Sequence, residues 1–177
     1  RPHLRSLFYT NRKIKNNMKY DIVDNFLSRE NFKMIEKELF RPTFPWFYNS
    51  SIADPTDDDM PYFTHHFYLN DEFNSDYRQL LLPILSKMKI KTLMRAKANM
   101  YLKTNKVIKH GLHVDRPFKH KGCIFYINTN NGFTVLEDGT EIKSVANRAL
   151  FFDSSKKHSS TSCTDQNIRV NININYF

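Results

Sequence analysis

The segment KHGLHVDRPFKH, residues 109–120, is rich in metal-binding residue types, because it holds three histidines and one aspartate. His113 and Asp115 are two positions apart, so on an extended chain both side chains would point to the same face. His110 and His120 do not share that spacing, and because they stand beside lysines in a loop we expect them to be solvated. The HxD pair alone is a weak signal, and a metal site needs a further ligand elsewhere in the chain.

A third ligand of a suitable type is His158, which follows the segment FFDSSKK much later in the sequence. Two imidazoles and one carboxylate on one face of a metal are the ligand set of the non-heme iron(II) oxygenases. Such a set leaves coordination positions for a bidentate cosubstrate and for dioxygen. Asp153 is a second carboxylate near His158, but it follows the apolar run LFF at a strand end, where a turn role is more common.

A residue that could bind such a cosubstrate is Arg169, in the segment IRVNININY, residues 168–176. If the chain from His158 to Arg169 forms a hairpin, Arg169 lies one strand away from the metal. Its guanidinium could then bind a distal carboxylate through two hydrogen bonds. Apolar residues alternate in this segment with Arg169 and three asparagines, so we expect an apolar face against helices and a polar face lining a cavity. Asparagine is uncommon in ordinary strands, so three on one face need an explanation, and the alternative to a cavity is an exposed edge strand.

The first third of the chain contains two predicted helices separated by an irregular segment. Residues 29–40 place apolar side chains at helical spacing, and Ser28 is a suitable N-cap. Residues 41–63 contain several prolines and the aromatic run Trp46–Tyr48, which either forms a binding loop or covers the edge of the core, with equal weight. A second helix is predicted over 76–89, with Pro83 as a kink. His65 and His66 alternate with aromatic residues, and a place at the core edge is the better interpretation.

From about residue 92 the sequence predicts short strands separated by turns. The segments rich in strand-forming residues are 95–103, 107–115, 122–128, 132–139, 140–146, 148–154 and 168–177. The sequences Asn-Asn-Gly at 130–132 and Asp-Gly at 138–139 are typical of hairpin turns. This spacing favours a β-sandwich or jelly roll. We therefore expect one domain, mainly β, with N-terminal helices packed on a C-terminal double sheet.

The charge and composition suggest a leader followed by a single domain. The 177-residue chain has a formal net charge of +9, and the first 17 residues supply five basic side chains and no acidic ones. We expect residues 1–17 to be a basic leader that is flexible or non-native, and residues 18–177 to be the domain. More than half of the charge excess lies in this leader, so nucleic-acid binding is not inferred. No run of eighteen apolar residues occurs, which argues against a membrane span. Cys123 and Cys163 are interpreted as free thiols in a reducing compartment, the cytoplasm, or the host cytoplasm if the protein is viral.

Residues 20–177 resemble the Fe(II)- and 2-oxoglutarate-dependent dioxygenases. The resemblance is to their prolyl-4-hydroxylase-like branch, and within it to small oxygenases of marine phages. The matching segments are HVD at 113–115, FYIN at 125–128, NGFTVLEDG at 131–139, ALFFD at 149–153 followed by His158, and IRVNI at 168–172. The opening segment DIVDNFLSRENFKMI is similar to the lead-in helix of the family. The resemblance implies a double-stranded β-helix, which is a cupin-like jelly roll.

The same resemblance implies roles for seven residues. His113, Asp115 and His158 would bind Fe(II), and Arg169 would pair with the 5-carboxylate of 2-oxoglutarate. Tyr126 would donate to that carboxylate. The two remaining residues, Asn99 and Tyr101, lie in the strand before the HxD motif, where relatives place an Asn or a Tyr near the cosubstrate. The implied reaction consumes dioxygen and releases succinate and carbon dioxide.

The sequence leaves the substrate open. The hypotheses are hydroxylation of a peptide or protein side chain, oxidation of a small molecule or of a nucleobase, and a non-catalytic jelly-roll module with a structural metal such as zinc. The complete set of three ligands and Arg169 argues against the last of these. An open groove lined by Trp46, Phe47 and Tyr48 would suit a chain-like substrate, and a closed pocket would suit a small molecule. The expected partner is therefore a small molecule or a peptide, with nucleic acid less favoured and no membrane; the oligomeric state is open.

Overall fold

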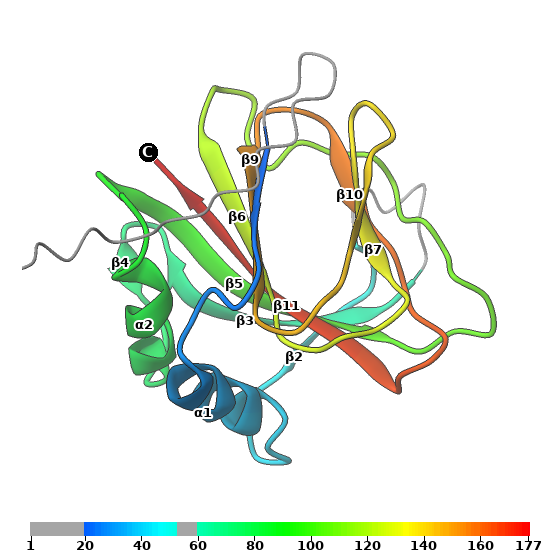
Figure 1. Cartoon of the computed structure of the whole chain (residues 1–177), viewed down its shortest axis with the longest axis horizontal. Coiled ribbons are helices and arrows are strands. Elements are labelled where there is room, and N and C mark those ends of the chain that lie inside the picture. Colours follow the sequence, from blue (N-terminus) through cyan, green and yellow to red (C-terminus); the bar gives the residue numbers. More distant parts are fainter. Residues whose placement is uncertain (1–19, 53–59) are drawn as a thin grey trace, which may run out of the picture.

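The computed structural model describes residues 20–52 and 60–177, and the predicted leader and the acidic run at 57–59 lie outside them. Within these residues the chain folds into two antiparallel sheets with two α-helices (Figure 1). The first half contains β1 (Asp21–Val23), α1 (Arg29–Leu39), β2 (Phe47–Asn49), β3 (Tyr62–Leu69), β4 (Glu72–Phe73), the 3-10 turn η1 (Arg78–Leu80) and α2 (Leu82–Leu85). The second half contains β5 (Leu93–Leu102), β6 (Lys121–Tyr126), β7 (Phe133–Leu136), β8 (Glu141–Lys143), β9 (Arg148–Asp153), β10 (His158–Ser160) and β11 (Ile168–Tyr176).

The larger sheet has the strand order β1-β9-β6-β11-β5-β3-β2, with β4 added beside β3, and the smaller sheet has the order β10-β7-β8. Figure 1 shows both helices on one side of the larger sheet and the smaller sheet on the other. Several neighbouring strands, such as β1 and β9 or β11 and β5, are distant in the sequence, as expected when a jelly roll wraps the chain back and forth between two sheets. The predicted β-rich jelly roll with N-terminal helices is confirmed.

The first helix, α1, forms where the sequence predicts it and anchors the core of the domain. The hydroxyl oxygen of Ser28 accepts a hydrogen bond from the Asn31 amide at 3.4 Å, which caps the first turn. Phe32, Ile35 and Leu39 are buried, and they pack in one cluster with the apolar side chains of β5 and β11. Helical spacing therefore places one stripe of α1 against the outer face of the larger sheet.

The two faces of β11 differ as the sequence predicts. Val170, Ile172 and Ile174 belong to the cluster that contacts α1. The alternate positions, Arg169 and the three asparagines, are buried on the opposite face rather than exposed. The reason is topological, because β11 lies between β5 and β6 in the middle of the larger sheet and is not an edge strand. Its polar face therefore looks into the space between the two sheets.

Three local predictions are wrong. Residues 76–89 do not form one kinked helix, because η1 ends before α2 begins and Pro83 lies in the first turn of α2. Proline lacks an amide hydrogen, so it fits a helix start better than a helix interior. Residues 107–115 form isolated bridges instead of a strand. The segment 41–63 is not wholly irregular, because it contains β2 and the start of β3.

The aromatic run at 46–48 has two different roles. Trp46 packs against Phe44 at a ring distance of 5.1 Å and donates its indole hydrogen to the Leu39 carbonyl at 3.3 Å. Phe47 and Tyr48 are instead 60% and 65% exposed, on β2 at the edge of the larger sheet. The core-edge interpretation therefore holds for Trp46 alone, and two large rings remain available at the surface.

Two further sequence expectations can be compared with the described residues. Cys123 and Cys163 are both buried and neither forms a disulfide. No helix within residues 20–52 and 60–177 has the length and apolar character that crossing a membrane requires.

Candidate metal centre

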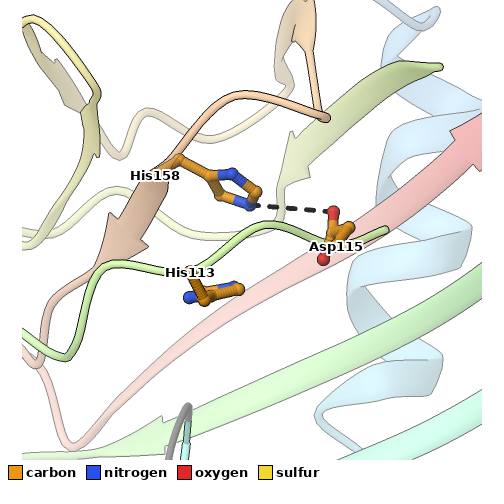
Figure 2. A group of neighbouring side chains, drawn as sticks. All are labelled: His113, Asp115 and His158. Atoms are coloured by element: carbon orange, nitrogen blue, oxygen red, sulfur yellow. Dashed lines mark ion pairs between the residues drawn. The ribbon is translucent and has the colours of Figure 1, made fainter. Parts of the chain in front are cut away.

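His113, Asp115 and His158 lie together, although His158 is far from the other two in the sequence (Figure 2). The amide of His113 donates to the His158 carbonyl at 3.0 Å, and the amide of His158 donates to the His113 carbonyl at 2.9 Å. This pair of backbone hydrogen bonds joins the irregular segment before β6 to β10. One ligand atom from each of the three side chains lies within 4.8 Å of the others. The single isolated bridge between His113 and His158 therefore brings the ligands together, which the predicted strand at 107–115 was expected to do.

The backbone sets which ring nitrogen of each histidine is available. Nδ1 of His113 lies 3.2 Å from the Gly111 carbonyl, and Nδ1 of His158 lies 3.0 Å from the Lys156 carbonyl. A carbonyl only accepts, so each Nδ1 carries the hydrogen and each Nε2 keeps a lone pair. Nε2 of His158 is buried without a hydrogen-bond partner. A buried acceptor without a partner is costly, and a metal ion would satisfy it.

The charge states of His158 and Asp115 also suit a metal. Burial lowers the pKa of His158, and the nearby Asp115 opposes this without reversing it. Burial by itself would raise the pKa of Asp115, but the Arg95 charge, His158 and two hydrogen bonds lower it well below its usual range. The site therefore offers a neutral imidazole and an ionised carboxylate, which are the forms that bind metals.

Asp115 is held by four side chains from three segments. Arg95 Nη2 pairs with Oδ1 at 2.6 Å. Oδ2 accepts from the Ser154 hydroxyl at 2.5 Å, from Asn175 at 2.8 Å and from Asn173 at 3.3 Å. These partners fix the orientation of the carboxylate, as outer residues commonly do around metal ligands. Nε2 of His158 lies 3.7 Å from Oδ2, so the two ligand atoms face each other across the space that a metal would fill.

Arg169 is fully buried and has no carboxylate partner among the described residues. Nε donates to the Ser144 hydroxyl at 2.8 Å, while Nη1 and Nη2 make longer contacts of 3.4 Å to the Thr161 carbonyl and to the Thr134 hydroxyl. The guanidinium lies 5.2 Å from the Tyr101 ring centre and 5.9 Å from that of Tyr126. A buried cation without an opposite charge lowers the stability of the fold. Arg169 is therefore suited to binding an anion that enters the cavity.

The expected hairpin between His158 and Arg169 does not form. β10 belongs to the smaller sheet and β11 to the larger one, so the chain crosses between the sheets. Arg169 therefore reaches from the larger sheet to Thr134 on β7 of the smaller sheet. The guanidinium bridges the two walls of the cavity instead of lying one strand away from the histidine.

The three remaining predicted residues lie on the same wall as Arg169. The buried Tyr126 hydroxyl donates to Thr134 at 2.8 Å, and burial raises the pKa of this phenol to about 12. Asn99 donates to the Asn171 side chain at 2.9 Å. Tyr101 stacks on Tyr62 with ring centres 5.8 Å apart.

Two of these side chains share a cavity with the two histidine ligands, and Thr134, which contacts Arg169 and Tyr126, lines it as well. Asn99 and Tyr101 line the same narrow space as His113 and His158, with a volume of about 30 Å³. That volume holds about two water molecules, so a diacid enters only if the lining side chains move apart.

Sequence reasoning missed several residues of this site. Arg95 and Lys97 share a face of β5 with Asn99, and their regular two-residue spacing was the available signal. Ser154 had no such signal, because only the fold brings it to Asp115. The asparagines of β11 were expected in a cavity, but not as donors to Asp115.

Other histidines differ in how well they were predicted. The expectation that His110 and His120 are solvated is wrong, because they are only 5% and 2% exposed. His110 stacks on Tyr101 with ring centres 5.6 Å apart, and His120 Nδ1 lies 2.8 Å from the Phe118 carbonyl. His65 does lie at the core edge, where it packs on Phe44. Both histidines lie close to aromatic rings and are buried, although lysines stand beside them in the sequence.

A larger hollow of about 650 Å³ lies beside the site, lined by His120, Phe152 and residues near the C-terminus. Its charged residues are three lysines and two aspartates: Lys91, Lys119, Lys121, Asp21 and Asp153. Asp153 also has the predicted turn role, because its Oδ1 accepts from the Ser155 amide at 3.1 Å. The mixed charge of this hollow differs from the continuous basic surface that nucleic-acid binding favours.

Comparisons with solved structures place the fold among oxygenases. The chain is similar to a prolyl-4-hydroxylase from Pseudomonas putida, with 11% identity, a TM-score of 0.65, and 90% and 92% of the two chains covered. It is also similar to a viral collagen prolyl hydroxylase from Paramecium bursaria Chlorella virus-1, solved with 2-oxoglutarate (13% identity, TM-score 0.57, 89% and 96% covered). A third is a Trichoplax adhaerens prolyl hydroxylase in complex with a peptide fragment (13% identity, TM-score 0.61, 89% and 83% covered).

Sequence comparisons add nothing to this likeness. No protein-family model matches the chain, and no curated protein matches it either. At these low identities the solved structures establish the fold alone, which the chain shares with these prolyl hydroxylases. The activity has to be argued from the site.

Proposed function

We propose that this protein is an Fe(II)- and 2-oxoglutarate-dependent oxygenase. The observation that carries the proposal is a pair of complementary features beside one narrow cavity, which His113, His158 and Thr134 line. One is the group of three metal-binding side chains, and the other is the buried Arg169 without a carboxylate partner among the described residues. The first feature alone would suit many divalent metals, and the second alone would suit many anions. Together they suit a metal and a dicarboxylate bound side by side.

The proposed roles follow from the contacts of each residue. Nε2 of His113, Nε2 of His158 and a carboxylate oxygen of Asp115 would bind iron. The unused hydrogens of Arg169 would bind the 5-carboxylate of 2-oxoglutarate. The Tyr126 hydroxyl, which keeps its proton because its pKa is raised to about 12, could turn from Thr134 to the same carboxylate. Asn99 and Tyr101 would contact the cosubstrate between these two ends.

Iron would supply the oxidative chemistry, in which dioxygen is consumed, 2-oxoglutarate loses carbon dioxide to give succinate, and a substrate C–H bond is oxidised. The protein would hold the metal ligands in a fixed orientation and exclude water from the site. Arg95, Ser154 and Asn175 hold the carboxylate of Asp115 in place. The Phe152 ring packs edge-on against His158 at 4.9 Å and keeps water from that side of the imidazole.

Among substrates, we favour a peptide or protein side chain, with a small molecule as the alternative. The exposed Phe47 and Tyr48 on β2, at the edge of the larger sheet, offer apolar surface to an extended chain. The peptide complex of the Trichoplax adhaerens enzyme gives a precedent within this fold. A cytoplasmic location, or the host cytoplasm if the protein is viral, agrees with two free buried thiols.

The test is the conversion of 2-oxoglutarate to succinate by protein that is purified without oxygen and then supplied with Fe(II) and air. Wild-type protein with Fe(II) should release succinate, and Asp115→Ala should not, because it removes the only anionic ligand of the three. Glu137→Ala is a matched control, because Glu137 is an exposed carboxylate beyond β7. Tight zinc binding with no succinate under any condition would favour the non-catalytic metal-binding module instead. Normal turnover by Asp115→Ala would contradict the ligand assignment.

A further inference from the structure

The wall of the cavity formed by β3 and β5 carries a second cation that the proposed function does not use. Lys97 pairs with Asn173 of β11 on one side and with His66 of β3 on the other in the strand register. Its neighbours Ala96 and Ala98 are fully buried in the core beneath the helices. Because side chains alternate along a strand, Lys97 must point to the opposite face, toward the metal ligands.

Lys97 lies at the level of the metal rather than at the level of Arg169. Arg169 pairs in register with Tyr101, four residues along β5 from Lys97, which is about 13 Å of strand. Arg95, the next residue on the same face of β5, contacts Asp115 directly. The charge of Asp115 also acts on Lys97. The two cations are therefore at opposite ends of the proposed cosubstrate, and one small diacid anchored at Arg169 does not need Lys97.

The Lys97 ammonium lacks an anionic partner among the described residues. Its Nζ donates to the Tyr62 hydroxyl at 3.4 Å and lies 5.5 Å from the centre of that ring. Burial raises the pKa of Tyr62 to about 12, so the phenol is neutral and leaves the lysine charge unpaired. An ammonium has three donors, and two of them have no acceptor here. Burial and the Arg95 charge accordingly lower the pKa of Lys97 to about 8.

The surroundings of Lys97 offer further polar groups with no partner. The ring of His66 makes no hydrogen bond within the described part of the chain, and burial together with the Lys97 and Arg95 charges lowers its pKa to about 4. Oδ1 of Asn173 and Nε of Arg95 are buried and also unpartnered. Such groups are rarely left unsatisfied in a native protein without a reason. Asn173 and Arg95 lie beside the metal ligands, whereas His66 lines a separate hollow at the edge of the sheet with Ser75 and Tyr77.

The overall charge of the site supports the same conclusion. The negative charge of Asp115 is neutralised by Arg95. The cosubstrate would then have to neutralise the positive charges of a divalent metal, Arg169 and Lys97. A dianion neutralises only part of that positive charge. A neutral or cationic substrate would leave the Lys97 charge buried and unpaired next to the metal, which is unfavourable.

We propose that the substrate carries an anionic group, a carboxylate or a phosphate, which the Lys97 ammonium binds at the wall formed by β3 and β5. This inference rests on the proposed oxygenase function, because it specifies the substrate class of that site. Lys97 as a whole residue is partly exposed, while burial of its ammonium is the largest cause of its lowered pKa. Lys97 would determine which substrates bind, because its charge and its place beside the metal favour an anionic group.

Binding to the whole chain loaded with Zn(II) and 2-oxoglutarate tests the proposal without turnover. The probes are three matched pairs, each blocked at both ends so that only the side chain differs in charge: glutamate and glutamine, the peptides Gly-Pro-Glu and Gly-Pro-Gln, and phosphoserine and serine. In calorimetry, the charged member of at least one pair should bind about tenfold or more tightly than its neutral twin. The pair that responds shows whether a small acid, an acidic peptide or a phosphate is recognised.

Two variants of Lys97 and one control complete the experiment. Lys97→Arg should keep the preference for the charged probe. Lys97→Met should reduce the ratio of the two affinities to about one, because it keeps the apolar stem and removes the charge. The ratio within one variant is independent of how much protein is active. Lys143→Met on β8, an exposed lysine, should behave like the wild type.

Four results would overturn the proposal: equal affinity for charged and neutral twins, no binding by any charged probe, a preference that survives in Lys97→Met, or a loss of 2-oxoglutarate affinity of about tenfold or more in that variant. The last result would make Lys97 a cosubstrate residue. Failure of the oxygenase function looks different. In that case wild-type protein with Fe(II) would make no succinate, while the charge preference of the Zn(II)-loaded protein would remain.

Discussion

Replacing Arg169 by methionine should weaken 2-oxoglutarate binding selectively, because the guanidinium is the only positive charge at that end of the described cavity. Methionine is also unbranched and flexible, so it fills much of the same space between Tyr101 and Tyr126. The substitution removes the charge and its hydrogen bonds while the metal ligands stay intact. Iron or zinc should therefore still bind.

The magnitude follows from the donors that Arg169 has left. A guanidinium carries five N–H donors, and three hydrogen bonds are made to Ser144, Thr161 and Thr134, two of them long at 3.4 Å. At least two donors are free for a bidentate carboxylate. Hydrogen bonds to a charged group contribute roughly 1.5–3 kcal/mol net, so we expect the dissociation constant to rise roughly 10- to 150-fold. We expect a rise in the lower part of this range. The cavity is narrow, so side chains must rearrange when 2-oxoglutarate binds to the wild type and also when it binds to Arg169→Met.

The assay compares two ligands by calorimetry on the Zn(II)-loaded protein. 2-Oxopentanoate has the same chain length as 2-oxoglutarate but lacks the distal carboxylate. The wild type should prefer 2-oxoglutarate, and Arg169→Met should bind both with similar affinity. Arg78→Met, which alters an exposed arginine on η1, should keep the wild-type preference.

Thermal unfolding of the same variant separates a binding role from a structural one. Arg169 is buried without an opposite charge, so its replacement by an apolar residue should leave the melting temperature unchanged or higher. The reasoning is refuted if Arg169→Met unfolds several degrees earlier and still discriminates between the two ligands. The arginine would then be a structural bridge between β11 and β7, and the cosubstrate anchor would lie elsewhere.

Three further predictions concern the metal ligands, the pH dependence and the core. Ser154→Ala should weaken Fe(II) binding about 10- to 100-fold in a metal titration, because Asp115 loses the hydroxyl that fixes its Oδ2 at 2.5 Å; unchanged affinity would show that the asparagines suffice. His66 has a pKa lowered to about 4, so the unfolded chain binds a proton more readily than the folded one between pH 6.5 and 4, and stability falls as the pH drops through that window. Between pH 7 and 5 the loss should be on the order of 1 kcal/mol in denaturant melts, because solvent around the half-exposed ring screens part of the effect, and it should shrink in His66→Gln. Ile35→Ala should lower the free energy of unfolding by about 2–5 kcal/mol, because Ile35 is fully buried on the face of α1 that packs on the larger sheet. The control Lys37→Ala, on the exposed side of α1, should change the free energy of unfolding by less than about 0.5 kcal/mol.

Local patterns in the sequence indicated correctly the parts that depend on nearby residues. Helical spacing and a capping serine located α1 to within one residue of its end. The alternation in 168–176 identified both faces of β11, because a strand repeats every two residues wherever it lies. The types of the candidate ligands were also visible, since two histidines and an aspartate are a metal-binding set in any fold.

Only the tertiary structure decided how these pieces meet. The HxD segment is not a strand, and two backbone hydrogen bonds to β10 bring His113 to His158. Arg169 reaches the cavity from the facing sheet instead of from a hairpin. Arg95, Ser154 and Asn175 surround Asp115 from three separate segments, and no periodicity links them. The physical reason is that periodicity reports one element at a time. Charge pairing and desolvation depend instead on which distant elements the packed core brings to the same place.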